Sequence, residues 1–437
     1  MTIVFDVIGG KPFEGRLRVP GDKSISHRSI MLGALANGVT EVYGFLEGED
    51  SLATLRAFRA MGVAIDGPNQ GRLIIQGVGL YGLQPSSEPL DLGNAGTAMR
   101  LMTGLLAGQF FDSVLVGDDS LSRRPMHRVI EPLNRMGALI ESTFAGTAPL
   151  RIHGGRHLRG INYLLPMASA QVKSALLLAG LYAAGRTTIT ELAISRDHTE
   201  RMLSRFGYPV ERQKFQVSLD GGGLLRATSI NIPADLSSAA FFLVGATITP
   251  GSDLILEHVG INSTRSGILN ILNAMGANIQ IMNEQVIGGE TVANLRVRYA
   301  PLHGITIPEQ WVPLAIDEFP ILFIAAACSE GVTVLTNAAE LRVKESDRIQ
   351  SMAHGLCTLG IDAMPTREGM IIRGGQFHGG EIDSYGDHRI AMAFTMAALR
   401  SQGSIRIRDC ANIDTSFPNF VGLARASGMD IAVTQFN

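Results

Sequence analysis

The amino-acid sequence predicts an α/β protein of two domains, each made of three βαβαββ repeats. A helical phrase that stops at a glycine and then leads into a strand recurs six times, with 68 to 84 residues between successive glycines. These glycines are Gly62, Gly137, Gly207, Gly276, Gly360 and Gly428. Short runs rich in β-forming residues, such as "GRLIIQG", "SVLVG" and "SIRIRD", lie between the helices and are bounded by Gly, Asn and Asp. A period of about 70 residues with two helices in each period indicates repeated α/β units.

Two series of helices alternate along the chain. One series ends at the glycines named above, because glycine tolerates the left-handed backbone that terminates many helices. The other consists of alanine-rich stretches that end at Gly38, Gly108, Gly185, Gly251, Gly331 and Gly403. Stretches such as "AQVKSALLLAGLYAAG" are nearly uncharged, and a helix that is apolar on all sides is expected to be buried. Central helices surrounded by sheets favour compact three-repeat domains over an open solenoid, whose repeats contact only their neighbours. The second group of three repeats begins after Pro233.

Composition limits the partners and the location. The chain has 437 residues, of which 46% are hydrophobic and 18% charged, and its formal net charge of -3 gives no indication of a nucleic-acid or membrane surface. The opening "MTIVFDVIGG" lacks the basic flank and cleavage site of a signal peptide. The longest apolar runs are shorter than the roughly 20 residues that span a bilayer. The three cysteines are scattered and odd in number, which favours reduced thiols over a disulfide frame or a zinc site. We therefore expect a cytoplasmic protein.

Basic residues cluster at helix starts, where the helix dipole disfavours them. Nine of them stand within about a turn of an expected helix start: Lys23, Arg28, Arg100, Arg123, Arg124, Arg196, Lys344, Arg348 and Arg389. A bound phosphate or carboxylate makes a basic residue favourable at this position, since the backbone amides, the dipole and the cation then all attract the same anion. Because these residues recur at equivalent repeat positions in both halves, we expect a shared anion-binding site rather than separate solvated faces.

The glycine-rich segment "LGNAGTAMR" suits a close approach of backbone to ligand. Gly93 and Gly96 supply the freedom for that approach, and Thr97 is expected to cap the following helix. The Lys-Ser/Thr ending of a P-loop is missing and no GxGxxG follows a strand, so nucleotide binding is not expected. No histidine has ligand-like spacing to another or to a cysteine, so no metal is expected. His388, next to Arg389, is the histidine expected at the site.

Two acidic residues stand at helix starts in the second half. Asp317 lies in "IDEFP", and Glu345 lies in "VKESDR" beside Lys344 and Arg348. A carboxylate among cations has a lowered pKa and stays ionised, as a general base should. Simple ion pairs, Lys344 with Asp347 or Glu345 with Arg348, explain these acids equally well. The residues alone therefore predict a site for small anionic metabolites, with carboxylates for proton transfer and no nucleophilic cysteine.

The chain resembles the 5-enolpyruvylshikimate-3-phosphate (EPSP) synthase family over residues 19 to 420. The segments that carry the resemblance stand in the family's order: "PGDKSISHR", "LGNAGTAMR", "SRRPM", "SAQVKSALLLAG", "SRDHTERML", "DEFP", "ELRVKESDRI", "GDHRIAMA" and "TSFP". The resemblance implies two domains of three repeats each, arranged as inside-out α/β barrels, with the chain crossing between them twice. It places residues 20–235 in a first domain on the shikimate 3-phosphate side and residues 1–19 plus 236–437 in a second on the phosphoenolpyruvate side. The active site would lie in the cleft between them.

The family transfers the enolpyruvyl group of phosphoenolpyruvate to the 5-hydroxyl of shikimate 3-phosphate, without a cofactor, by addition and then elimination of phosphate. The resemblance implies that shikimate 3-phosphate is bound by Lys23, Ser24, Arg28, Ser169, Gln171, Ser195, Arg196, Asp317 and Lys344. It implies that phosphoenolpyruvate is bound by Lys23, Gly96, Arg124, Gln171, Arg348, His388 and Arg389. In these roles Asp317 takes the hydroxyl proton, Glu345 handles the proton at the methylene carbon and Lys23 touches both substrates. A monomer without nucleic-acid or membrane partners is expected.

Three positions depart from the family's common pattern. Asp414 stands where many members carry a lysine, and Glu340 stands where some carry an asparagine. Leu101 follows Arg100 where glyphosate-sensitive members often have proline. Gly96 is retained where some tolerant members have alanine, so we expect sensitivity to glyphosate.

Two other functions are compatible with parts of the pattern. UDP-N-acetylglucosamine enolpyruvyl transferase shares the donor and the chemistry, but that family uses a loop cysteine in its first third, and no cysteine precedes Cys328 here. A non-catalytic anion-binding or RNA-end-binding repeat protein would keep the basic helix starts but would have no need of Asp317 and Glu345.

Overall fold

The computed structural model describes residues 2–436, which form twelve α-helices, two in each of six repeats. The first helices of the repeats are α1 (Lys23–Leu35), α3 (Gly96–Leu106), α5 (Ala170–Gly180), α7 (Leu236–Ile248), α9 (Phe319–Ala327) and α11 (His388–Ala397). The second helices are α2 (Glu49–Ala60), α4 (His127–Arg135), α6 (His198–Arg205), α8 (Gly267–Ala274), α10 (Arg348–Thr358) and α12 (Phe420–Ala426). The predicted sixfold α/β repeat is confirmed. Within this part of the chain no helix is long and apolar enough to cross a membrane.

The chain divides into two units. The inserted unit comprises Gly21–Ile232 together with Ile287–Glu290. The terminal unit comprises the residues up to Pro20, Pro233–Val286 and the residues from Thr291 on, so it holds both ends of the chain. Each unit has its own hydrophobic core and contains three repeats.

Three four-stranded sheets belong to the inserted unit. The first has the order β14 (Ser229–Asn231), β3 (Asn37–Tyr43), β5 (Arg72–Val78), β4 (Ile65–Asn69). The second has the order β6 (Leu90–Asp91), β7 (Ser113–Val116), β9 (Leu150–His153), β8 (Leu139–Glu141). The third has the order β10 (Asn162–Leu164), β11 (Arg186–Thr190), β13 (Gln216–Asp220), β12 (Glu211–Gln213). In each sheet one parallel pair precedes two antiparallel pairs. Strand β14 from the end of the third repeat pairs with β3 of the first, which ties the unit together.

The terminal unit also contains three sheets, of which two have four strands and one, antiparallel throughout, has three. The first has the order β2 (Glu14–Leu17), β15 (Asp253–Gly260), β17 (Glu290–Arg298), β16 (Asn278–Ile287). The second has the order β18 (Val332–Leu335), β20 (Gly369–Arg373), β19 (Asp362–Thr366). The third has the order β21 (Gly380–Asp383), β22 (Ile405–Arg408), β1 (Thr2–Gly10), β23 (Met429–Phe436). The amino-terminal strand β1 therefore completes the sheet of the last repeat. Among residues 2–436 no sheet closes into a barrel, so "inside-out" describes sheets around helices rather than a closed ring of strands.

Short 3-10 helices occur beside several of the helix starts. They are η1 (Leu121–Arg123), η2 (Glu309–Trp311), η3 (Pro313–Ala315), η4 (Ala339–Val343), η5 (Ala398–Arg400) and η6 (Ala411–Thr415).

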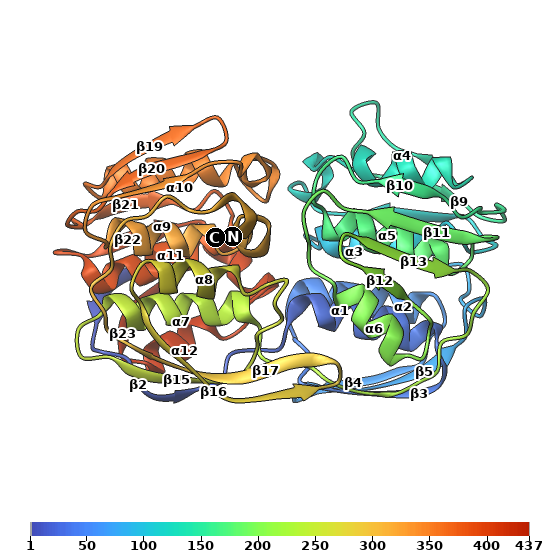
Figure 1. Cartoon of the computed structure of the whole chain (residues 1–437), viewed down its shortest axis with the longest axis horizontal. Helices are drawn as coiled ribbons and strands as arrows, with labels where there is room; N and C mark the ends of the chain where they lie inside the picture. Colours follow the sequence, from blue (N-terminus) through green and yellow to red (C-terminus); the bar gives the residue numbers. More distant parts are fainter. Residues whose placement is uncertain (1, 437) are drawn as a thin grey trace. The chain divides into compact units, whose positions relative to one another are not determined.

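The first helices are largely buried inside their units, as their mainly apolar sequences predict (Figure 1). All thirteen residues of α7 and all nine of α9 are buried. Helices α3 and α5 approach so closely that a Cβ on Gly104 would stand 2.1 Å from the carbonyl oxygen of Ala175. The glycines that end the second helices have φ between 76° and 104°, where a side chain would be strained. This confirms their predicted role as helix terminators.

Candidate active site

Helix α1 begins at Lys23, whose ammonium pairs with the carboxylate of Asp50 at the start of α2. Asp22 caps the helix by accepting from the backbone N–H of Ile25 at 2.9 Å. The Lys23 side chain is 21% exposed and that of Asp50 only 6%. The sequence did not single out Asp50, because its position also suits an ordinary acidic residue in a first helical turn.

Arg28 connects three helices. Its Nε donates to Thr199 Oγ1 of α6 at 2.7 Å, one terminal nitrogen to Ser174 Oγ of α5 at 2.9 Å, and the other to the carbonyl of Ser24 at 2.9 Å. Burial lowers the pKa of Arg28 to about 10, although nearby Glu200 opposes that effect. A guanidinium has five N–H groups, so these bonds leave two for a ligand. Arg28 therefore both links three helices and remains a candidate contact for phosphate.

Arg124 is held against the glycine-rich segment before α3. Its terminal nitrogens donate to the side-chain oxygen of Asn94 at 2.5 Å, the carbonyl of Asn94 at 3.3 Å and Ser120 Oγ at 3.2 Å. A Cβ added to Gly96 would lie 2.9 Å from one of these nitrogens. Gly96 therefore leaves the space that the guanidinium occupies. Arg123, also singled out by the sequence, is exposed.

Arg100 and Gln171 join the starts of α3 and α5. Arg100 donates to Gln171 Oε1 at 2.7 Å, and Gln171 Nε2 donates to Thr97 Oγ1 at 2.9 Å. The expectation that Thr97 caps α3 is wrong: Ala95 occupies the cap position and makes no side-chain bond, while the Thr97 hydroxyl orients Gln171 instead.

Ser169 and Ser195 lie at two neighbouring helix starts. Ser169 caps α5, with its hydroxyl 3.4 Å from the backbone nitrogen of Val172. The hydroxyl of Ser195 donates to Glu191, so it can only accept from a ligand. Arg196, next along the chain, is half-buried two residues before α6.

In the terminal unit, Arg348 at the start of α10 gathers three carboxylates. Its Nε lies 2.8 Å from Asp387 Oδ2, and its terminal nitrogens lie 2.6 Å from Glu345 Oε2 and 3.6 Å from Asp317 Oδ1. Burial alone would lower the pKa of Arg348, but Asp387 and Glu345 raise it above its ordinary value. Burial would also raise the pKa of Asp387, yet Arg348 holds it below its usual range. The predicted acids Asp317 and Glu345 thus flank one buried cation.

Lys344 also lies beside Asp317, with its ammonium 3.5 Å from Oδ1. Of the two ion pairs considered from the sequence, Glu345 with Arg348 is present. The pairing of Lys344 with Asp347 is wrong, because Asp347 pairs with Arg342 instead. Glu340, one helical turn before Lys344, lies 3.9 Å from the ammonium and adds negative charge there.

Arg389 and His388 open helix α11. A terminal nitrogen of Arg389 donates to the carbonyl of Asp317 at 2.9 Å, which ties α11 to the segment that carries this acid. His388 is buried. Asp414, which replaces a lysine common in the family, is exposed in η6, and η6 packs against α11.

The predicted residues therefore form two sets, one in each unit. The set in the inserted unit carries mostly cations and hydroxyl groups: Lys23, Ser24, Arg28, Gly96, Arg100, Arg124, Ser169, Gln171, Ser195 and Arg196. The set in the terminal unit combines cations with acids: Asp317, Lys344, Glu345, Arg348, His388 and Arg389. Residues 2–436 hold no group of three side chains suited to a metal ion. Anion binding and proton transfer are thus the chemistry that these side chains offer.

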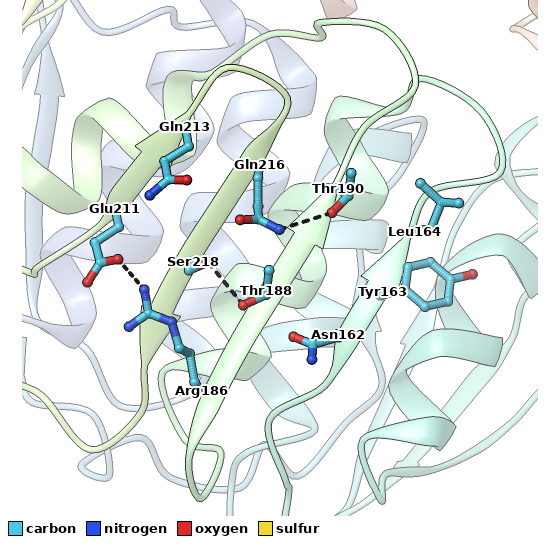
Figure 2. Close-up of a pocket in the computed structure, with 10 residues that line it drawn as sticks. All are labelled: Asn162, Tyr163, Leu164, Arg186, Thr188, Thr190, Glu211, Gln213, Gln216 and Ser218. Carbon is cyan, nitrogen blue, oxygen red and sulfur yellow. Dashed lines mark hydrogen bonds and ion pairs between the residues drawn. The ribbon is translucent and has the colours of Figure 1, made fainter.

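One hollow of 440 Å³ lies apart from both sets, on a face of the sheet β10-β11-β13-β12 (Figure 2). Its walls are mainly polar: Asn162, Tyr163, Leu164, Arg186, Thr188, Thr190, Glu211, Gln213, Gln216 and Ser218. Many of these side chains bond to one another; Thr188 and Ser218, for example, lie 3.0 Å apart. None of the predicted site residues lines this hollow.

Comparison with known proteins first defines the class. The chain has the fold of an enolpyruvyl transferase, since the structure of NikO from Streptomyces tendae matches with a TM-score of 0.80 over 100% of this chain and 99% of that one. Sequence identity to NikO is only 16%, so that match shows the fold alone.

The chain belongs to the EPSP synthase (3-phosphoshikimate 1-carboxyvinyltransferase) family, whose profile matches residues 7–423. It is 66% identical to the 3-phosphoshikimate 1-carboxyvinyltransferase of Methylococcus capsulatus over 99% of both chains. It is also 66% identical to that of Alkalilimnicola ehrlichii, over 97% of this chain and 96% of the other. The structure of EPSP synthase from Acinetobacter baumannii matches with a TM-score of 0.89 and 56% identity, over 99% of this chain and 100% of that one. The family that the sequence motifs indicated is confirmed.

Proposed function

We propose that this protein transfers the enolpyruvyl group of phosphoenolpyruvate to the 5-hydroxyl of shikimate 3-phosphate, releasing phosphate. Membership of the EPSP synthase family supports the reaction. The observation that carries the proposal is the arrangement around Arg348, where Asp317 and Glu345 lie 3.6 and 2.6 Å from one buried guanidinium. A protein that only binds anions has no need of two carboxylates held among cations.

The reaction needs a base at the hydroxyl and an acid at the methylene carbon. In the addition step the 5-hydroxyl oxygen bonds to C2 of phosphoenolpyruvate, Asp317 takes the hydroxyl proton, and C3 receives a proton from Glu345. In the elimination step Glu345 takes back a proton from the new methyl group, phosphate departs from C2 and the double bond re-forms. Lys344 places a positive charge 3.5 Å from the Asp317 carboxylate that accepts the proton.

Cations offset the charges of the substrates and of the intermediate. We assign phosphoenolpyruvate to Lys23, Gly96, Arg124, Gln171, Arg348, His388 and Arg389. We assign shikimate 3-phosphate to Lys23, Ser24, Arg28, Ser169, Gln171, Ser195, Arg196, Asp317 and Lys344. Both sets of residues would then serve the same pair of substrates. Arginines already fixed by protein contacts need little reorganisation when charge develops, which is the main source of electrostatic catalysis.

We further propose that the protein works as a monomer in the cytoplasm, on small molecules alone. Its three cysteines are free, which suits a reducing compartment. Its net charge of -3 suits small-molecule substrates better than nucleic acid.

Phosphate release from phosphoenolpyruvate and shikimate 3-phosphate tests the proposed function. The wild type should release phosphate only when both substrates are present. Asp317→Asn should lower kcat by about 10²- to 10⁴-fold, because a general base is lost. Asp253→Asn is the matched control, since Asp253 pairs with Arg296 at a partly exposed position away from the site residues, and it should keep full activity. Binding of both substrates by the wild type with no phosphate release would favour a non-catalytic anion-binding protein instead.

A further inference from the structure

A buried lysine that the proposed mechanism does not use lies behind the shikimate 3-phosphate residues. Lys173 of α5 is 1% exposed. Its ammonium lies 2.8 Å from Glu191 Oε2 and 2.8 Å from Glu200 Oε1, and 3.4 Å from the carbonyl oxygen of Ser195. Glu191 follows strand β11, and Glu200 lies in the first turn of α6. One charged group therefore joins three segments of the inserted unit.

The charges in this cluster balance one another. Burial alone would lower the pKa of Lys173, but Glu200 and Glu191 raise it above its ordinary value, so the ammonium stays charged. Burial raises the pKa of Glu191, and Lys173 opposes that effect. Arg28 is a second buried cation of this unit: burial lowers its pKa most strongly, and among the acids Glu200 does most to raise it. Two cations and two carboxylates are thus buried in the same interior.

The cluster continues into a second link between α5 and α6. Thr199 donates to Ser174 at 2.7 Å, directly beside the Lys173–Glu200 pair in both helices. Both hydroxyls accept from the guanidinium of Arg28 in α1. The starts of α1, α5 and α6, which carry most of the residues assigned to shikimate 3-phosphate, are therefore fixed to one another by a single polar network.

Ser195 is the point where this network meets the ligand residues. Its hydroxyl donates to Glu191, and its carbonyl lies within reach of Lys173. The orientation of Ser195, and of Arg196 next to it, thus depends on a charge that does not itself face the substrate. Removal of the ammonium would leave two carboxylates buried against each other and would release this segment.

We propose that Lys173 is a positioning residue for shikimate 3-phosphate binding, acting through Glu191 and Ser195. This inference rests on the proposed function. It assigns to Lys173 an effect on one substrate, whereas a lysine that only stabilised the fold would affect both substrates alike or neither.

Lys173→Met tests this proposal by comparing the two substrates. Misplacement of a ligand-binding segment by about 1 Å commonly costs from tenfold to a hundredfold, so the Kd for shikimate 3-phosphate, measured by calorimetry without phosphoenolpyruvate, should rise at least about tenfold. The KM for phosphoenolpyruvate at saturating shikimate 3-phosphate should stay within about twofold, as for an uncoupled site. Lys173→Arg keeps the charge and should recover part of the lost affinity.

Two further variants separate positioning from stability. Leu219→Ala removes a buried side chain next to Gly180, at the other end of α5, and should lower the urea midpoint without changing the Kd. Glu191→Gln keeps the Lys173–Glu200 pair but weakens the hydrogen bond from the Ser195 hydroxyl, so it should raise the Kd for shikimate 3-phosphate. This variant tests the proposal even if Lys173→Met fails to fold. An unchanged Kd in folded Lys173→Met or in Glu191→Gln, or equal losses for both substrates, would overturn the proposal. A wild type that binds no shikimate 3-phosphate would instead contradict the proposed function.

Discussion

Arg348 and Asp387 form an ion pair that is closed to solvent, with 1% and 0% of their side chains exposed and 2.8 Å between Nε and Oδ2. Asp387 also accepts from the backbone N–H of Arg389 at 2.9 Å and so caps α11. The pair thereby fixes the start of α10 to the start of α11. Glu345 and Asp317 bind the same guanidinium, so the candidate catalytic acids are placed by a contact deep in the fold.

Arg348→Met should destabilise the protein by about 3–5 kcal/mol, because it leaves Asp387 as a buried charge without its cation. Urea unfolding measures this loss. Arg373→Met is the control, since Arg373 and Asp362 form an exposed pair 3.8 Å apart, and surface pairs contribute little. Equal losses of unfolding free energy in the two variants would show that the ion pair of Arg348 and Asp387 contributes no more to stability than a surface pair.

The same pair predicts a dependence of stability on pH. The pKa of Asp387 in the folded protein lies below its ordinary value of 3.8. Its ionised form therefore stabilises the fold above that pH, and the contribution is lost as the pH falls further through the folded-state pKa. The gap in unfolding free energy between wild type and Asp387→Asn should be constant near neutral pH and shrink below pH 3.8. A gap that widens on acidification would contradict this sign.

Glu345→Gln should separate proton transfer at the methylene carbon from substrate binding. The amide keeps a similar shape and can no longer act as a general acid or base, so kcat should fall by about 10²- to 10⁴-fold. With both substrates in D₂O, the wild type should place deuterium on the vinyl carbon, which NMR detects, and the variant should not. Glu340→Gln, 3.9 Å from Lys344 and partly exposed, is the comparison and should exchange normally. Exchange at the wild-type rate in Glu345→Gln would assign this proton to another group.

Gly96→Ala should weaken phosphoenolpyruvate binding selectively. The new methyl group would stand 2.9 Å from a terminal nitrogen of Arg124 and 3.2 Å from one of Arg100, so the guanidinium must move. The KM for phosphoenolpyruvate should rise about tenfold, whereas the Kd for shikimate 3-phosphate should not change. Glyphosate should inhibit the wild type at millimolar concentration and the variant less. Gly375→Ala, whose Cβ would meet only Ile361 at 3.5 Å, should behave as wild type.

Local features of the chain were readable from its sequence. Each glycine such as Gly62 or Gly276 acts on its own helix end, so its left-handed backbone follows from residue type and helical pattern alone. The family motifs likewise located Asp317, Glu345 and Arg348 together. The burial of α7 followed from its lack of charged residues.

The partners of side chains that meet across the fold could not be predicted from the sequence. Asp50 meets Lys23 and Asp387 meets Arg348 only after helices from different parts of the chain have packed. Thr97 looked like a cap because capping is local, yet its hydroxyl bonds to Gln171, which lies 74 residues away. Only one feature of the sequence pointed to the buried position of Lys173: it is the sole charged residue of α5. That feature predicts a buried charge but not the identity of its counter-ions.

Strand β1 lies between β22 and β23, so the last repeat combines the first residues of the chain with its last. A ribosome makes β1 well before β22 and β23, and domains generally fold as they emerge. Residues 21–232 of the inserted unit are continuous and can fold early, whereas β1 must remain unpaired until β22 and β23 have been made. The unit that carries Asp317, Glu345 and Arg348 should therefore complete its last sheet only after the inserted unit has folded.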